Sequence, residues 1–214
     1  REARRRRRIV SVGRLVEKKG FGPLIEASRR LKEHGLDFET EIVGDGPLEG
    51  ELKALIARLG VGDRVILKGK AVLQEELPAL LRGADVYAQP CVWSRDDDVD
   101  GTPRTLMEAM ACGAPAVATC IAGLPDIVEH DQSGLLVLPN DVEGLADALQ
   151  RVLTDDALAR RLARGGRDQI VARFQIVPCL KPLAALFQER IARRPGPAEQ
   201  TASSRLAPAR ARAT

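Results

Sequence analysis

Two carboxylates, Asp100 and Glu108, flank the predicted start of a helix in the segment "DVDGTPRTLMEAM". Thr102 is well placed to cap this helix, and Pro103 to be its first helical residue. The backbone amides of residues 104–106 would then be free to bind an anion, because unpaired donors and the helix dipole both favour negative charge there. Carboxylates do not bind phosphate, but they accept hydrogen bonds from hydroxyl groups. The spacing therefore favours a ligand with phosphates in its middle and hydroxyls at both sides, as in a nucleotide-sugar.

Both carboxylates also have a purely structural explanation. Glu108 could cap a neighbouring loop, and Asp100 could be solvated in the polar loop before the helix. A single motif is weak support for function. Spacing alone leaves the two interpretations equally open.

Two further segments offer groups that could bind a diphosphate. In "GRLVEKKG", Arg14 follows Gly13 at the end of an apolar run, and Lys19 precedes a glycine. Two cations could neutralise a diphosphate as it leaves, although solvated loop charges are their more usual role. In "GDGP", Gly44 and Gly46 would let the backbone turn sharply and approach a ligand, but this pattern alone indicates only a turn.

The composition indicates a globular protein and argues against nucleic-acid binding. The 214 residues include 44% hydrophobic and only 3% aromatic residues, so aliphatic side chains must build the core. The net charge is +3, but the arginines at the two ends exceed that value, so the body of the chain is acidic. A nucleic-acid-binding domain would have a basic body with interleaved aromatics. No unbroken apolar run reaches the roughly 18 residues of a membrane span, and no hydrophobic signal segment opens the chain.

The cysteines and histidines do not indicate a metal site. None of the four cysteines forms a C-x-x-C pair, and each lies among apolar residues, as free buried thiols do in a reducing cytosol. His34 and His130 are far apart and have no ligand-like neighbours. We expect no metal and no cofactor, and we expect a cytoplasmic protein.

Short apolar runs alternate with amphipathic segments along the chain. The runs predict strands buried on both faces, and the amphipathic segments, with glycine stops such as Gly35 and Gly60, predict helices. This alternation predicts an α/β fold with a doubly wound parallel sheet. The strands are expected within 8–15, 37–47, 64–69, 85–90, 115–119 and 134–138, and the helices within 21–35, 48–60, 74–84, 103–113, 141–155 and 156–174.

Ligands of such sheets bind beyond the carboxyl ends of the strands. The three unusual clusters, "GRLVEKKG", "GDGP" and "DGTPRTLMEA", each follow a predicted strand. Together with "ADVYAQP", "EAMACGAPAVAT", "GLPDIV" and "SGLLVLPND" they resemble the nucleotide-sugar-binding, C-terminal half of the retaining glycosyltransferases of family 4, which have the GT-B architecture. The resemblance spans residues 9 to about 174 and preserves the order of the motifs.

The resemblance implies roles for individual residues. Arg14, Lys19 and Asp100 match catalytic positions: the first two belong to the diphosphate clamp, and Asp100 faces the donor sugar. Glu108 matches the glutamate that holds the ribose hydroxyls. The remaining substrate-binding positions are Gly13, Gly44, Gly46, Lys70, Ala71, Gly101, Thr102, Thr105 and Leu106; Thr105 and Leu106 belong to the helix start that binds the distal phosphate, and the segments around residues 44–46 and 70–71 form the wall around the nucleoside.

The sequence departs from the family pattern in three ways. Asp100 stands where the family has a longer glutamate, and "GLPD" replaces "GxPE". The third difference is that GT-B enzymes have an N-terminal domain that binds the acceptor, whereas this chain starts at the linker. We therefore expect it to be a fragment or the product of a split or truncated gene. Within the family, the loop "PCVWSRDDDVDGTP" is most similar to members that build bacterial surface polysaccharides.

Three functional interpretations follow. The chain is the donor half of a retaining enzyme that transfers a hexosyl group to a polysaccharide, lipid or other acceptor, or it binds a nucleotide-sugar without catalysis. A third interpretation, half of a sugar-nucleotide epimerase, fits "EAMACG" and "GRLVEKKG" poorly. The partners expected are a nucleotide-sugar donor and an acceptor bound through a missing domain.

The ends of the chain are expected to differ from the sheet domain at 9–174. Residues 1–8 are expected to form a basic linker; contact of Arg4–Arg8 with anionic lipid at the inner face of a membrane is the less favoured alternative. Residues 175–192 are expected to form a closing helix that packs on the missing domain, with its start broken by Pro178 and Pro182. Residues 193–214 are expected to be disordered.

Overall fold

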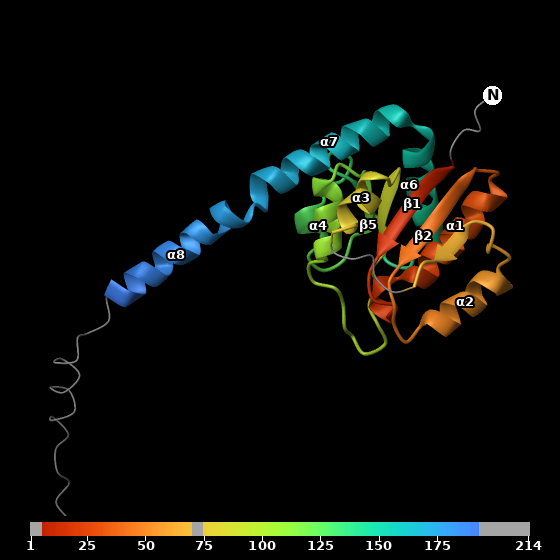
Figure 1. Ribbon diagram of the computed structural model, residues 1–214, viewed down its shortest axis with the longest axis horizontal. Helices are drawn as coiled ribbons and strands as arrows, with labels where there is room; N and C mark the ends of the chain where they lie inside the picture. The colour runs from red at the N-terminus through yellow and green to blue at the C-terminus, as the bar shows by residue number, and fades with distance from the viewer. Residues whose placement is uncertain (1–5, 70–74, 193–214) are drawn as a thin grey trace, which may run out of the picture. The chain divides into compact units, whose positions relative to one another are not determined.

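A parallel sheet of six strands is the framework of the protein (Figure 1). The computed structural model describes residues 6–69 and 75–192. Its strands are β1 (Arg7–Val12), β2 (Phe38–Val43), β3 (Val65–Leu67), β4 (Val86–Gln89), β5 (Ala116–Thr119) and β6 (Leu135–Val137). They are hydrogen-bonded in the order β3-β2-β1-β4-β5-β6, and every pair is parallel. The doubly wound parallel sheet predicted from the alternating pattern is confirmed.

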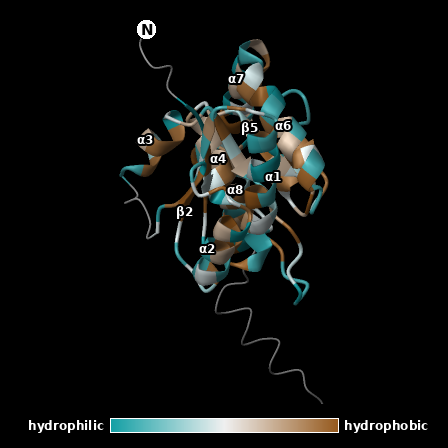
Figure 2. Ribbon diagram, turned by 90° about the vertical axis from the view of Figure 1, so that its right-hand side faces the viewer, coloured by the Kyte–Doolittle hydropathy of each residue, from teal (hydrophilic) through white to brown (hydrophobic). Residues whose placement is uncertain are grey.

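Helical elements connect consecutive strands, and three further helices of the described residues, α6 to α8, follow β6. In chain order the helical elements are η1 (Glu17–Lys19), α1 (Phe21–Glu33), α2 (Glu49–Arg58), α3 (Leu77–Arg82), α4 (Arg104–Ala111), α5 (Leu124–Ile127), α6 (Val142–Thr154), α7 (Asp156–Arg173) and α8 (Ile176–Ala192). The short elements η1 and α5 were not predicted, because three or four residues are too few to show a helical period. Figure 2 shows hydrophilic and hydrophobic residues side by side around α1, as expected for helices that cover a sheet.

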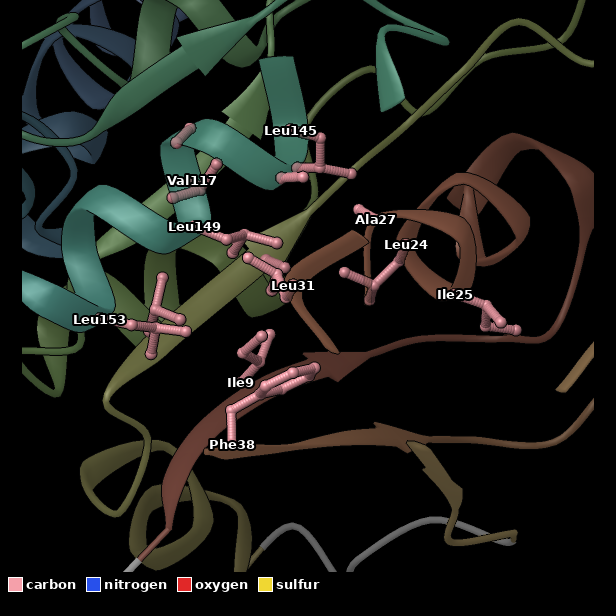
Figure 3. Packing of buried hydrophobic residues seen from close by; sticks show 14 of the residues in the cluster. Ile9, Leu24, Ile25, Ala27, Leu31, Phe38, Val117, Leu145, Leu149 and Leu153 are labelled. Atoms are coloured by element: carbon pink, nitrogen blue, oxygen red, sulfur yellow. The ribbon is translucent and has the colours of Figure 1, made fainter. Parts of the chain in front are cut away.

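The largest core lies between the sheet and the helices α1 and α6. Leu24 and Leu31 of α1 and Leu149 of α6 point towards Ile9 and Phe38 of the strands (Figure 3). All five side chains are fully buried. Burial of each side chain of this size contributes about 1.5–3 kcal/mol, so this layer holds the strand ends in place.

The structure divides into two compact units, up to Ala172 and from Arg173 onwards. In the second unit, α8 runs from Ile176 to Ala192 and contains Pro182 within the helix. The expectation that Pro178 and Pro182 break the start of this helix is therefore wrong. Pro178 lies in the first turn, where a backbone N–H has no helical partner in any case, so the loss of that donor costs little.

The second unit is apolar on its surface. By length and composition alone, one helical segment of the described residues, Asp156–Ile191, which begins in the first unit, could cross a membrane. An 18-residue window within this segment has a mean hydropathy of 1.5, and 6% of the window is buried. Charged residues such as Lys181 interrupt this segment, which explains why no unbroken apolar run is visible in the sequence. The cytoplasmic location stays a prediction.

Three arginines of the N-terminal run are paired with carboxylates. Arg7 is the first residue of β1, inside the stretch assigned to a linker, and its guanidinium lies 3.2 Å from Asp85 and 2.5 Å from Asp156. Arg8 donates hydrogen bonds to Glu41, and Arg6 lies 3.2 Å from Asp37. The charges of Arg6–Arg8 are therefore used within the domain, whereas Arg4 and Arg5 lie outside the described residues.

Candidate functional site

A cavity of about 450 Å³ lies at the carboxyl ends of β1 and β2, where they meet the start of α4. In the order β3-β2-β1-β4, the neighbours β1 and β4 are the point at which the strand order reverses, and ligands of doubly wound sheets bind there. Each wall of the cavity comes from a different part of the sequence. The lining residues are Val12, Gly13, Arg14, Val43, Gly44, Asp45, Leu77, Arg104, Thr105 and Glu108.

Glycines allow the loops after β1 and β2 to approach each other. Gly44 has a φ of 151°, and a Cβ atom at this position would lie 1.8 Å from the carbonyl oxygen of Gly13. Only glycine fits such an approach. Gly46 allows a similar approach, because a Cβ atom there would lie 2.5 Å from the carbonyl oxygen of Leu15. Gly46 itself does not line the cavity. The "GDGP" turn thus shapes one wall through backbone packing.

The helix start differs by one residue from the sequence prediction. Pro103 is the N-cap of α4, with φ −67° and ψ 112°, and Thr102 is exposed and forms no side-chain cap. The amide of Leu106 donates to the carbonyl of Pro103 at 3.2 Å, so it is not one of the free donors. The predictions that Thr102 caps the helix and that the amide of Leu106 is free are wrong, whereas their roles in ligand binding stay predictions. The amides of Arg104 and Thr105 have no hydrogen-bond partner among the residues that the structure describes.

Lys19 and Asp100, which come from different loops, form an ion pair with each other. Their side chains are 14% and 18% exposed. The aliphatic part of Lys19 crosses Gly13, where an added Cβ atom would lie 3.1 Å from the lysine Cε. Lys19 therefore lies beside the wall that Gly13 gives to the cavity, although neither Lys19 nor Asp100 lines it.

Two further ion pairs join the same two loops. The amine of Lys18 lies 2.7 Å from Asp98, and Arg95 lies 3.5 Å from Glu17. The hydrogen bond between Lys18 and Asp98 raises the pKa of the lysine and lowers that of the aspartate. Together with the Lys19–Asp100 pair, these contacts hold the acidic loop at 94–100 against η1.

Gln89, at the end of β4, connects these groups and was missed by the sequence analysis. Its side chain is 1% exposed, it accepts hydrogen bonds from the hydroxyls of Tyr87 and Thr105 at 3.0 and 3.5 Å, and it donates to the thiol of Cys91 at 3.2 Å. The Cys91 sulfur lies 3.9 Å from Asp100. Burial raises the pKa of the Cys91 thiol to about 11, so the thiol is neutral. A polar residue at the end of a buried strand was the available signal.

The other predicted positions are distributed around this centre. Gly101 is exposed, and its carbonyl accepts a hydrogen bond from the amide of Gly123 at 3.1 Å. The side chain of Leu106 is fully buried in the core. Lys70 and Ala71 lie outside the described residues. Asp45, Leu77 and Arg104 line the cavity but were not predicted as site residues.

The cavity combines groups suited to anions with groups suited to hydroxyls. Arg14, Arg104 and Thr105 line the cavity, the last two with unpaired amides, and so do the acidic residues Asp45 and Glu108. Cations and helix amides bind phosphate, whereas carboxylates accept hydrogen bonds from hydroxyl groups. A phosphate-containing, polyhydroxylated ligand matches both.

The sequence matches the family model "Glycosyl transferases group 1" over residues 1–169. The chain belongs to this family. It is 42% identical over 182 residues to a colanic acid biosynthesis glycosyltransferase, WcaL, of Escherichia coli K12, a match that covers 84% of this chain and 44% of the relative. It is 40% identical over 185 residues to the amylovoran biosynthesis glycosyltransferase AmsK of Erwinia amylovora, which covers 86% of this chain and 45% of the relative. The chain thus spans less than half the length of these relatives.

Solved structures of glycosyltransferases have the same fold. Anabaena Alr3699/HepE in complex with UDP and glucose matches with a TM-score of 0.76 and 25% identity, over 86% of this chain and 48% of that one. The C-terminal domain of a group 1 glycosyltransferase from Francisella tularensis, LpcC, matches with a TM-score of 0.70 and 25% identity, over 79% of this chain and 87% of that one. The group 1 chain described here has the Rossmann-like fold of GT-B enzymes and corresponds to a C-terminal domain.

Proposed function

We propose that this chain is the donor-binding part of a retaining glycosyltransferase, which transfers a hexosyl group from a nucleotide-diphosphate sugar to a glycan or lipid-linked acceptor. The observation that carries the proposal is the cavity at the point where the strand order of the sheet reverses. Arg14, the start of α4 and Glu108 all line this one cavity. Family membership supports glycosyl transfer. The UDP and glucose in the HepE structure support a nucleotide-sugar as the donor.

Each group has a proposed role in donor binding. The guanidinium of Arg14 and the amides of Arg104 and Thr105 bind the diphosphate, and Glu108 accepts hydrogen bonds from the ribose hydroxyls. Lys19 completes the diphosphate clamp after it leaves Asp100, and Asp100 is then free to bind a hydroxyl of the donor sugar. This exchange of partners accounts for an ion pair between two groups that the donor would separate.

The proposed reaction requires stabilisation of a leaving diphosphate. The bond between the anomeric carbon and the phosphate oxygen breaks, and its electron pair leaves with the nucleoside diphosphate. The acceptor oxygen forms a new bond on the same face of the sugar, and its proton passes to the departing phosphate. Arg14, Lys19 and the helix start stabilise the charge that develops on this phosphate.

A binding module without catalysis is the second candidate. The ion pair between Lys19 and Asp100 favours this candidate. Lys19 is a cation of the proposed clamp and Asp100 is the group that would face the donor sugar, and in the structure each is engaged with the other. Both candidates require the same donor cavity. They differ only in turnover with an acceptor.

Donor binding is tested by calorimetry with UDP, GDP and ADP and their glucose or mannose derivatives. We expect one nucleotide to bind saturably, and Arg14→Ala to weaken it by about 1–3 kcal/mol, the range for a lost hydrogen bond to a charged group. Arg82→Ala is the matched control, because Arg82 is an exposed arginine at the end of α3 and lies outside the cavity. Equal affinities for the two variants would contradict the site.

Turnover separates the two candidates. The chain is mixed with the N-terminal domain of WcaL and with glycan acceptors, and release of the nucleoside diphosphate is followed over time. Transfer that falls in Arg14→Ala and Lys19→Ala, with unchanged thermal unfolding, supports the enzyme. Donor binding without any transfer supports the binding module.

A further inference from the structure

A second cavity, of about 550 Å³, lies at the same end of the sheet as the donor cavity and has no assigned function. It is formed by η1 and the start of α1, by α2, by the segment after β4 and by the turn after β6. The loop after β4 and α2 lie at this end of the sheet (Figure 1). Its floor is apolar and includes Phe21, Leu52 and Val92, which are 3 to 5% exposed.

Trp93 is the distinctive residue of this cavity. It is the only tryptophan of the chain, it lines the cavity, and it is 53% exposed. A large aromatic ring that stays half in solvent beside an apolar floor offers a flat contact surface together with one N–H donor. Exposed aromatic surface of this kind is enriched at binding sites.

The rim of the cavity carries polar groups without partners. Glu51 and Arg58 on α2, and the side chain of Asn140, form no hydrogen bond or ion pair with any residue in the part of the chain that the structure describes. An apolar floor with a few convergent polar groups is typical of a site for an organic ligand. A sugar ring has the matching chemistry, because its C–H face is apolar and its hydroxyls radiate from the edge.

The Trp93 cavity and the donor cavity each share lining residues with a hollow between them. A third hollow, of about 400 Å³, shares Arg14 with the donor cavity and shares Val16, Glu17 and Leu48 with the Trp93 cavity. Lys18 and Lys19 line this intermediate hollow. A glycan that extends from the Trp93 cavity would therefore cross the clamp residues on its way to the donor.

We propose that the Trp93 cavity is a subsite for the acceptor glycan, in which a hexose unit stacks on Trp93 and its hydroxyls bind Glu51, Arg58 or Asn140. This unit precedes the one that carries the reacting hydroxyl, which lies over the intermediate hollow. The inference rests on the proposed function, because an acceptor subsite has meaning only beside a donor site. It assigns part of acceptor binding to this chain.

A glycan fits the cavity better than an acyl chain or a second protein copy. An acyl chain has no use for the unpaired carboxylate, guanidinium and amide on the rim, and their desolvation would oppose its binding. A cavity of about 550 Å³ is of the size that binds small molecules, and protein interfaces require a broader surface.

The single tryptophan gives a direct measurement. The full chain is titrated with cellotetraose and with oligosaccharides released from colanic acid, and the emission of Trp93 is followed. We expect a saturable blue shift with at least one oligosaccharide, because stacking removes water from the indole. Monomeric dodecylphosphocholine is the probe for an acyl chain, and a shift with this detergent alone would overturn the proposal, as would no shift with any of these probes.

Variants then locate the site by calorimetry. Trp93→Ala is expected to weaken the oligosaccharide by about tenfold or more and Trp93→Phe by less, since stacking on the aromatic ring is lost in the first and retained in the second. Affinity for UDP should stay unchanged in both. Leu138→Ala, at a residue that is 67% exposed and outside the cavity, is the control for a general loss of exposed apolar surface.

The two proposals fail in different ways. Absence of nucleotide binding with an intact oligosaccharide response would remove the donor site and leave a glycan-binding cavity without a role in transfer. Intact UDP binding with equal oligosaccharide affinity in wild type and Trp93→Ala would remove only the subsite.

Discussion

Lys19 and Asp100 form an ion pair with each other, although the family resemblance implies that each should contact a different part of the donor. A diphosphate that takes Lys19 must compete with an existing carboxylate. Part of the binding free energy is then used to separate the pair. The sequence predicts that Lys19 binds the diphosphate, and the structure adds that Asp100 competes with the diphosphate for Lys19.

Removal of the Asp100 charge should strengthen binding of a nucleotide without a sugar. In Asp100→Asn, Lys19 has no anionic partner, so we expect UDP, or the nucleotide that binds in its place, to bind about threefold to tenfold more tightly, equivalent to roughly 1 kcal/mol. The nucleotide-sugar should gain less, because it loses the contact of its sugar with Asp100. Calorimetry with both ligands measures the difference.

Asp98→Asn is the matched control for this comparison. This variant breaks the ion pair between Asp98 and Lys18, which joins the same loop to η1 as the Lys19–Asp100 pair does. Lys18 does not line the donor cavity. We expect no change in nucleotide affinity. A gain of similar size in both variants would mean that loosening of the loop is the cause.

Glu108 is exposed and lines the cavity, and its carboxylate has no hydrogen-bond partner among the described residues, so this carboxylate is available to a ligand. Glu108→Ala should weaken nucleotide binding by about 1–3 kcal/mol, the range for hydrogen bonds to a charged group. Glu26→Ala, an exposed glutamate on α1 outside the cavity, should leave it unchanged. A nucleobase without ribose should bind both variants equally, and a difference there would contradict a ribose contact.

At the scale of elements, a buried carboxylate joins the three strands next to the donor cavity. Glu41 on β2 is 2% exposed; Arg8 of β1 donates to it at 2.7 Å, and the amine of Lys68, after β3, lies 2.8 Å away. Burial raises the pKa of this carboxyl, but the hydrogen bonds from Lys68 and Arg8 outweigh burial, and the pKa is lowered overall. The ionised form therefore stabilises the folded state.

Glu41→Gln should lower the free energy of unfolding by about 1–3 kcal/mol at neutral pH. Because the folded pKa lies below the ordinary value of 4.5, this contribution is fully present above pH 4.5 and is lost as the pH falls through the folded pKa. The difference between wild type and variant in urea unfolding should shrink at acidic pH. Glu39→Gln, in the same strand, is the control, and a difference independent of pH would exclude the carboxylate charge as the cause.

The elements could be predicted from sequence wherever the chain shows a clear period. The apolar runs gave β1 to β6, and the glycine stops ended α1 and α2 close to Gly35 and Gly60. The start of α4 was misplaced by one residue, because local preference favours Thr102 as the cap and Pro103 inside the helix, whereas the structure has Pro103 as the cap without a side-chain hydrogen bond. Local preference also predicted the wrong outcome for Pro182, which lies inside α8.

The candidate site was predictable in part. The positions after strand ends identified Arg14, Gly44, Thr105 and Glu108, which the fold brings to one cavity because parallel strands end at the same edge. The Lys19–Asp100 pair depends on the conformations of two loops, and the contacts of Gln89 depend on which face of β4 it occupies. Residue spacing predicts neither the loop conformations nor the face of β4 on which Gln89 lies. Trp93 was visible in the sequence, but its cavity requires four separate segments.

At the scale of the molecule, the exposed apolar side chains of α8 in the second unit indicate that this helix is weakly protected from exchange. Leu180, Leu183 and Phe187 of α8 are 46 to 60% exposed. We expect fast hydrogen exchange over residues 177–192 and slow exchange in β1, which has a buried centre and is paired with two strands. The amides of α6, a helix packed on the core, are the control. Equal protection in α8 and α6 would contradict an unpartnered α8.

The position of β1 has a consequence for the growing chain on the ribosome. Of the six strands of this sheet, β1 is synthesised first, although it is an inner strand between β2 and β4, and its pairing with β4 joins Ile9 to Val86. Until β4 has left the ribosome, one edge of β1 has no partner, and an exposed apolar edge is prone to pair with other chains. Nascent chains that end before β4 should therefore be the form most in need of chaperones, and those that include β4 should be the first to bury this edge.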